Sequence, residues 1–359
     1  MHIPDGYLSP STCAVLYGAT LASWYVCLKR LKRVLLTRVV PLISVFAAFA
    51  FVVMMFNLPL PGGTTGHALG VTIAAIVLGP WGAVLSTSLA IALQALLFGD
   101  GGITTLGANC FNMAVIGALV AYVVYRLLAM QSSIDSRRRV VAAGIAGYVA
   151  ANASALAAAI ELGIQAALFH DATGTPLYAP YPLKIAIPAM LIGHLTFAGI
   201  AEAVLSAGLL AYLQTADPGL LMGTSGGAQS ATGSPLRSSA SVRNLWVTVA
   251  VLLILTPLGV LATGKAWGEW APSDFVHAET RVQIAAASRD QGPPTTVPTG
   301  MARMATLWTS PFPAYAPAFV KSHALGYLLS AMFGVGLLLL IALAAGRRWR
   351  IRIRPEQAT

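Results

Sequence analysis

Charged residues are scarce in this sequence. Only 9% of its 359 residues are Asp, Glu, Lys or Arg, whereas a soluble domain carries roughly 25%. So few charged groups cannot cover a soluble globule of 37.3 kDa, and the mean hydropathy of +0.75 agrees with this. The composition excludes an ordinary soluble enzyme and indicates a polytopic membrane protein.

Cysteine is scarce as well, and several catalytic motifs are missing. The three cysteines lie in or beside apolar runs without CxxC spacing, which excludes a disulfide framework and a zinc knuckle. No GxxxxGK[ST] loop and no HExxH pair occurs, so the chain has no ATP site and no metalloprotease signature of the usual kind.

The net charge of +10 does not indicate a nucleic-acid partner, because the basic residues lie in short clusters between apolar runs. Sixteen of the 22 Lys and Arg residues fall in four such clusters, at 29–38, 126–139, 237–243 and 347–354. Membrane proteins keep loops of this kind in the cytoplasm.

Nine apolar runs are long enough to be considered as membrane-spanning helices. The alternation of the basic clusters places the amino terminus outside and the carboxyl terminus in the cytoplasm. We therefore expect an all-α polytopic protein of the cytoplasmic (inner) membrane, surrounded by lipid, with nine transmembrane helices near 11–28, 39–56, 66–79, 81–98, 106–129, 140–169, 184–213, 244–262 and 323–345.

A segment rich in Gly, Ser, Thr, Ala and Gln at 214–243 predicts a flexible cytoplasmic linker. It separates residues 1–213, the first unit, which has seven predicted helices, from residues 244–359, the second unit, which has two. Within the second unit, residues 263–322 are expected to form an external loop with little core of its own.

The chain opens with residues 1–10 (MHIPDGYLSP), which lack the basic start of a cleavable signal peptide. Met1 is expected to keep a free α-amine facing the outside. This amine, the main-chain nitrogen of His2 and its Nδ1 can chelate a metal in one plane, and His67, after a Gly-rich loop, can supply a fourth nitrogen. A planar nitrogen set suits Ni(II) or Cu(II). The alternatives are a Met-His start without function and a hydrogen-bonding role for His67 at the membrane interface.

Other polar residues within the apolar runs are candidates for a second shell or a proton relay, because polar groups in a bilayer are costly. Hydrogen bonding between helices is the competing interpretation for each of them. The candidates are Asn109, Glu161, His194 and Glu202. On the first helix, Ala14, Gly18 and Ala22 recur every four residues and are candidates for packing against a partner helix, although internal packing would use the same pattern.

Three motifs of the first unit resemble the CbiM/NikM family of cobalt and nickel substrate-specificity subunits of energy-coupling-factor transporters. They are residues 1–10, 61–67 (PGGTTGH) and 107–117 (GANCFNMAVIG). In the second unit, residues 256–259 (TPLG) and 264–270 (GKAWGEW) resemble the small N component of these transporters. The whole chain is thus similar to a fused NikMN-type protein.

The resemblance implies that Met1 and His2 supply three nitrogens, and His67 the fourth, to one Ni²⁺ or Co²⁺ ion carried as substrate. It also implies a transmembrane T subunit and ATP-binding-cassette ATPase subunits as partners. The expected function is capture of a divalent transition metal, nickel rather than cobalt, without enzymatic activity. A proton-coupled secondary transporter using His194 and Glu202, and an intramembrane metal-dependent hydrolase, are the alternatives.

Overall fold

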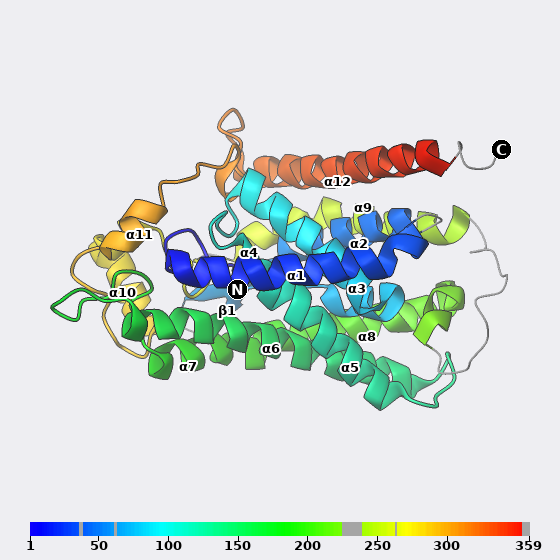
Figure 1. The fold of residues 1–359 in the computed structure, drawn as a ribbon, viewed down its shortest axis with the longest axis horizontal. Helices are drawn as coiled ribbons and strands as arrows, with labels where there is room; N and C mark the ends of the chain where they lie inside the picture. The colour runs from blue at the N-terminus through cyan, green and yellow to red at the C-terminus, as the bar shows by residue number, and fades with distance from the viewer. Residues whose placement is uncertain (36–38, 61–62, 225–238, 263, 354–359) are drawn as a thin grey trace.

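Long helices dominate the computed structural model, which describes residues 1–359 except 36–38, 61–62, 225–238, 263 and 354–359. They lie side by side along the long axis of the molecule (Figure 1). The main helices are α1 (Pro10–Leu35), α2 (Val39–Met54), α3 (Val71–Leu93), α4 (Leu106–Asn109), α5 (Gly117–Ala129), α6 (Arg137–Leu168), α7 (Leu183–Gly193), α8 (Gly199–Ala216), α9 (Ser239–Leu255) and α12 (His323–Ile353).

Six helical segments among the described residues are long and apolar enough to cross a membrane. Two shorter apolar helices, Val40–Met54 and Leu245–Leu261, accompany them. Many large apolar side chains on these helices are exposed, among them Val15, Val204 and Ile254. An apolar perimeter of this kind is what lipid solvates, so the prediction of a multi-pass helical membrane protein is confirmed.

The predicted spans 66–79 and 81–98 differ from the observed structure. Residues 66–70 are not helical, and one helix, α3, runs through both predictions and continues into a π-helical turn, Gln94–Phe98. Gly79 interrupts α3 with φ 74° and ψ 170°, directly before Pro80. A left-handed φ of this kind is open to glycine, so the Gly-Pro pair breaks the helix where the sequence predicts a turn.

Small residues allow the helices of the first unit to approach one another closely. The 32-residue helix α6 buries a face rich in alanine against α5, α7 and α8. A Cβ atom on its Gly147 would lie 2.7 Å from Oγ of Ser206 on α8. Close backbone contact through Ala and Gly is the usual way in which membrane helices associate.

Three π-helical turns interrupt the bundle, at Gln94–Phe98, Cys110–Ile116 and His194–Ala198. Turns of this kind widen a helix by one residue and often occur at functional sites. Each of them begins at or next to a buried polar residue, namely Gln94, Asn109 and His194. The irregular turns therefore coincide with the polar residues that the sequence singles out.

The predicted external loop, residues 263–322, contains short helices. It contains α10 (Ala278–Ala287), α11 (Thr299–Met304) and two 3₁₀ turns, Pro272–Phe275 and Pro313–Tyr315. Its side chains Trp267, Phe275 and Met301 are buried. α10 and α11 lie at the end of the bundle from which α1 starts, and α12 runs toward the opposite end (Figure 1). The expectation that the loop has little core of its own stays a prediction, because Trp267 and Phe275 lie together with Tyr7, Leu162 and Ala179 of the first unit.

A two-stranded hairpin connects α2 and α3 beneath this loop. β1 (Leu58–Leu60) pairs antiparallel with β2 (Thr64–Gly66). Thr65 of β2 also forms a parallel bridge with Ala266 of the second unit. The hairpin thus ties the loop of the second unit to the segment that leads into His67.

Candidate metal centre

The amino terminus lies inside the protein, not on its surface. Met1 and His2 are each 2% exposed, and Ile3 is fully buried. Asn109 accepts a hydrogen bond from the Ile3 amide (2.7 Å) and donates one to the Ile3 carbonyl oxygen (3.0 Å). This pair of bonds fixes the main chain one residue after His2.

The loop 99–102 lies close against the terminal segment. The Gly102 amide donates to the Ile3 carbonyl oxygen at 3.0 Å, and a Cβ atom on Gly102 would lie only 2.3 Å from the Asp5 nitrogen. Asp5 in turn accepts hydrogen bonds from the amides of Ile103 (3.1 Å) and Thr104 (2.7 Å). Glycine is required here because no side chain fits between the two segments.

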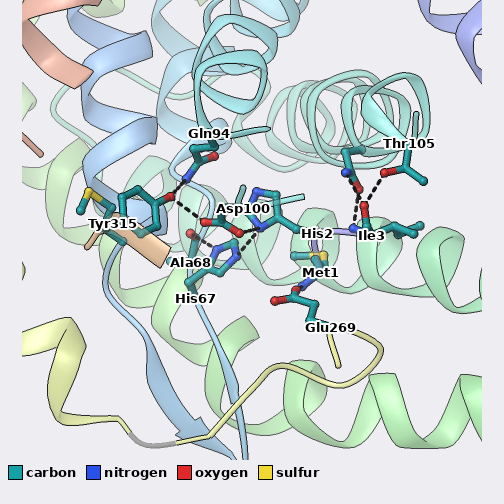
Figure 2. A network of polar contacts seen from close by, with 12 residues as sticks. Met1, His2, Ile3, His67, Ala68, Gln94, Asp100, Thr105, Glu269 and Tyr315 are labelled. Carbon is teal, nitrogen blue, oxygen red and sulfur yellow. Dashed lines mark hydrogen bonds and ion pairs between the residues drawn. The ribbon is translucent and has the colours of Figure 1, made fainter. Parts of the chain in front are cut away.

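His67 meets His2 directly. Its Nε2 is 3.2 Å from Nδ1 of His2, and the ring centroids are 5.0 Å apart (Figure 2). On the other side of the His67 ring, Nδ1 lies 3.0 Å from the Ala68 carbonyl oxygen. A carbonyl can only accept, so Nδ1 carries the proton and Nε2 presents its lone pair to His2.

Two carboxylates flank these nitrogens. Oε1 of Glu269, from the second unit, is 3.0 Å from the Met1 α-amine, and Oδ1 of Asp100 is 3.2 Å from Nδ1 of His2. Figure 2 shows both contacts converging on the terminus from different segments. A buried ammonium group requires such a partner.

Both imidazoles are neutral at pH 7. Burial, followed by the nearby α-amine, lowers the pKa of His2 to about 4. Burial and then the charge of His2 lower the pKa of His67 well below its usual value of 6.5. Neutral imidazoles are the form that binds metals, so neither ring needs to lose a proton from an imidazolium to act as a ligand.

The described residues contain no group of three or more His, Cys, Asp or Glu side chains that could hold a metal ion. Any metal site at the terminus must therefore use main-chain nitrogens in addition to side chains. The α-amine, the His2 amide nitrogen and the two imidazoles provide four nitrogen donors. Such a set suits square-planar ions and not hard cations, which need oxygen ligands.

The other predicted polar residues form hydrogen bonds with different partners. Asn112 donates a hydrogen bond to Oε2 of Glu161 at 2.7 Å. Nδ1 of His194 contacts the Met190 carbonyl oxygen at 2.8 Å, whereas its buried Nε2 has no hydrogen-bond partner. Of these residues, only Asn109 contacts the terminal segment.

Glu202 holds the start of α3 in place. Its Oε2 accepts hydrogen bonds from the amides of Leu69 (2.7 Å) and Gly70 (2.9 Å). A carboxylate at a helix amino terminus pairs with amides that have no partner within the helix. Within the described part of the chain, no hydrogen bond or ion pair joins Glu202 to His194.

Sequence reasoning missed three residues around the two histidines. Asp100, Glu269 and Tyr315 all approach the terminus. Tyr315 donates to Oδ2 of Asp100 at 2.6 Å and accepts from Nε2 of Gln94 at 3.0 Å. The only signals were a lone acidic residue among the glycines of 99–102 and another within 264–270, because the contacts themselves span up to 268 positions.

The residues Ala14, Gly18 and Ala22 lie on an exposed face of α1. A Cβ atom added to Gly18 would meet nothing within 4 Å. The alternative of internal packing against this chain's own helices is wrong, because the described residues leave the face open.

The fold and the buried terminus define a multi-pass membrane protein in which the α-amine and two imidazoles lie together inside the helix bundle. Residues 2–220 match the family model for the cobalt uptake substrate-specific transmembrane region, CbiM, and residues 243–350 match the PDGLE domain. The chain belongs to the CbiM family, and the resemblance seen in its motifs is confirmed.

Relatives of the whole length combine both parts. The fused nickel transport protein NikMN of Rhodobacter capsulatus is 52% identical over 97% of this chain and 98% of its own length. The fused protein LarMN of Lactiplantibacillus plantarum, described as a probable nickel transport protein, is 39% identical over 95% of this chain. Both names describe transport proteins, so the expectation that the chain is not an enzyme is confirmed.

Solved structures of similar proteins cover more than half of the chain. The crystal structure of a truncated transition metal transporter shares 53% identity with this chain, has a TM-score of 0.56, and covers 59% of this chain and 98% of that protein. A second transition metal transporter gives the same TM-score over 60% of this chain.

Proposed function

We propose that this protein captures a divalent transition metal, nickel in preference to cobalt, for uptake across the cell membrane. The observation that carries the proposal is the meeting of the Met1 amine, His2 and His67 in one buried cluster. The names of the two full-length relatives support nickel as the substrate.

The chemistry of the cluster explains the preference. Binding through the His2 amide nitrogen requires loss of its proton, which a metal with a strong square-planar preference compensates best. Ni(II) satisfies this requirement better than Co(II). Mg²⁺ is rejected because it requires octahedral oxygen ligands.

Energy for transport comes from partners in this proposal. The chain carries no phosphate-binding loop, so a separate ATPase module and a transmembrane T subunit supply ATP hydrolysis and coupling. The exposed small residues of α1 are the proposed contact for a partner helix, because Ala14, Gly18 and Ala22 let a second backbone approach closely.

The proposed topology has nine crossings, with the first unit at 1–213, a cytoplasmic linker at 214–243 and the second unit at 244–359. Two observations support it. Gly79 breaks α3 into two helical pieces, and the α5–α6 connection lies at the end of the bundle opposite α10 and α11 (Figure 1). Much of the linker falls at 225–238, outside the described residues.

A proton-coupled transporter using His194 and Glu202 has less support. Both oxygens of the Glu202 carboxylate have local partners, with Leu69 and Gly70 at one and Ser206 at the other. A relay needs a connected path of titratable groups, and no bond between the two residues provides one.

Titration of the purified chain with Ni(II) and Co(II), followed by visible absorption, tests the proposal. His2→Ala and His67→Ala should each lose the square-planar d–d band and weaken binding by about 100-fold or more, since each removes a direct ligand. His170→Ala is the matched control, because His170 is exposed in the 169–182 loop and should bind as the native chain does. Absence of binding in the native chain, or equal binding in the two ligand variants, overturns the proposed function.

A further inference from the structure

The second unit contributes a charged group to the terminus. Oε1 of Glu269 lies 3.0 Å from the Met1 α-amine, and the side chain is 22% exposed. Glu269 lies within the PDGLE-domain match at residues 243–350, whereas the CbiM match at residues 2–220 begins directly after Met1. This contact is therefore a property of the fused arrangement.

The segment that carries Glu269 is fixed on both sides. Before it, the Thr65 amide donates to the Lys265 carbonyl oxygen at 3.2 Å. After it, the Tyr7 hydroxyl donates to the Trp270 carbonyl oxygen at 2.8 Å. The buried side chains of Trp267 and Trp270 pack against each other with centroids 6.0 Å apart. Glu269 thus has little freedom to leave the amine.

Glu269 can still accept a hydrogen bond from the Met1 α-amine after that amine has bound a metal. An α-amine that coordinates a metal is an NH₂ group and still has two N–H bonds, one of which can point to Oε1. Hydrogen bonds from the outer shell orient ligands and strengthen them as donors, and their loss typically costs 10- to 100-fold in metal affinity.

The charge balance favours the same conclusion. A divalent ion with one deprotonated amide and neutral imidazoles leaves a complex of net charge +1 in a buried place. An isolated buried charge is costly unless it is paired. Glu269 and Asp100 are the carboxylates in contact with the chelating groups, and only Glu269 comes from the second unit.

We propose that Glu269 is a positioning residue of the metal site. It accepts a hydrogen bond from the metal-bound Met1 amine, holds the terminal chelate in place and slows dissociation of the metal. The inference rests on the proposed function, since it requires that the terminus bind the metal.

The test measures Ni(II) dissociation from the full-length chain after addition of an excess of chelator. Glu269→Gln keeps the shape and a weaker acceptor, whereas Glu269→Ala removes both charge and acceptor. Dissociation should be about 10- to 100-fold faster in Glu269→Ala, with Glu269→Gln between it and the native chain. The d–d band should be retained in Glu269→Gln and move to longer wavelength, because the amine becomes a weaker donor.

Glu279→Gln is the matched control, since Glu279 is an exposed carboxylate on α10 of the same loop. It should leave both the dissociation rate and the d–d band unchanged. If the rate depended only on the total negative charge of the loop, Glu279→Gln would change it as well. Native-like rates and an unshifted band in both Glu269 variants would overturn the inference. If the native chain itself shows no Ni(II) band, the proposed function fails instead, so the two failures are distinguishable.

Discussion

The two units of the chain contribute different groups to one site. All four candidate nitrogen donors belong to the first unit, at Met1, His2 and His67, whereas the second unit contributes oxygen atoms at Glu269 and Tyr315. The donors decide which metal fits. In the proposed site, the oxygen atoms of the second unit determine how rigidly the nitrogen donors are positioned.

In the proposed site, the first unit sets which class of metal binds, and the second unit sets how long the metal stays bound. A planar nitrogen set is chemically complete without the second unit, since none of its donors comes from there. The second unit closes over it through Glu269, the bridge between Thr65 and Ala266, and the bond from Tyr7 to Trp270. Loss of the donors should therefore cost more than loss of the closure.

The largest effect is expected from one extra residue, such as Ala, placed ahead of Met1. The α-amine would move away by one residue, and a peptide nitrogen would replace it in a pocket where Met1 is 2% exposed. Metal affinity of the buried site should fall by about 1,000-fold or more, because the α-amine leaves its place beside Glu269 and the two imidazoles. Calorimetric titration with Ni(II) measures this.

The matched control for that extension is the same residue added after Thr359, at the far end of the chain. It should bind Ni(II) as the native protein does. Equal Ni(II) affinity in the two extended proteins would mean that the terminal amine is not a donor. The comparison between nitrogen donors from the first unit and oxygens from the second unit would then fail.

A smaller effect is expected from removal of residues 240–359. The CbiM family model matches residues 2–220, so the remaining chain should fold. It should still show the d–d band, but lose Ni(II) about 10- to 100-fold faster, because the amine lacks its carboxylate partner. In cells that contain the transport partners, metal uptake should fall, and normal uptake would rule out a role for the second unit in loading.

Much of the first unit could be predicted from sequence because its signals are local. Apolar runs of membrane length predicted the five long helical segments of the first unit, and the Met-His start with the later His67 indicated the ligand candidates. The boundary between the predicted spans 66–79 and 81–98 coincides with the break in α3 at Gly79. These features depend on neighbouring residues, which a sequence displays directly.

The partners of the ligands could not be predicted, because they depend on folding over long distances. Glu269 lies 268 positions from Met1, and Tyr315 lies 215 positions from Asp100. The helices of the loop 263–322 were not visible in its sequence, since Pro and charged residues surround isolated apolar residues such as Phe275 and Met301, which are buried in the folded protein. Glu202 looked like part of a relay because helical spacing does not show that α3 begins beside it.

The smallest effect on metal binding is expected on the outer face of α1. Gly18→Leu should leave Ni(II) affinity unchanged, because Gly18 is exposed and a Cβ atom there meets nothing within 4 Å. It should nevertheless lower uptake in cells, since a bulky side chain would keep a partner helix at a distance. Gly208→Leu on α8 is the matched control, as Gly208 is equally exposed with the same open space. If both variants transport normally, α1 is not the partner face; if only Gly18→Leu fails while binding persists, capture and delivery are separate properties of the first unit.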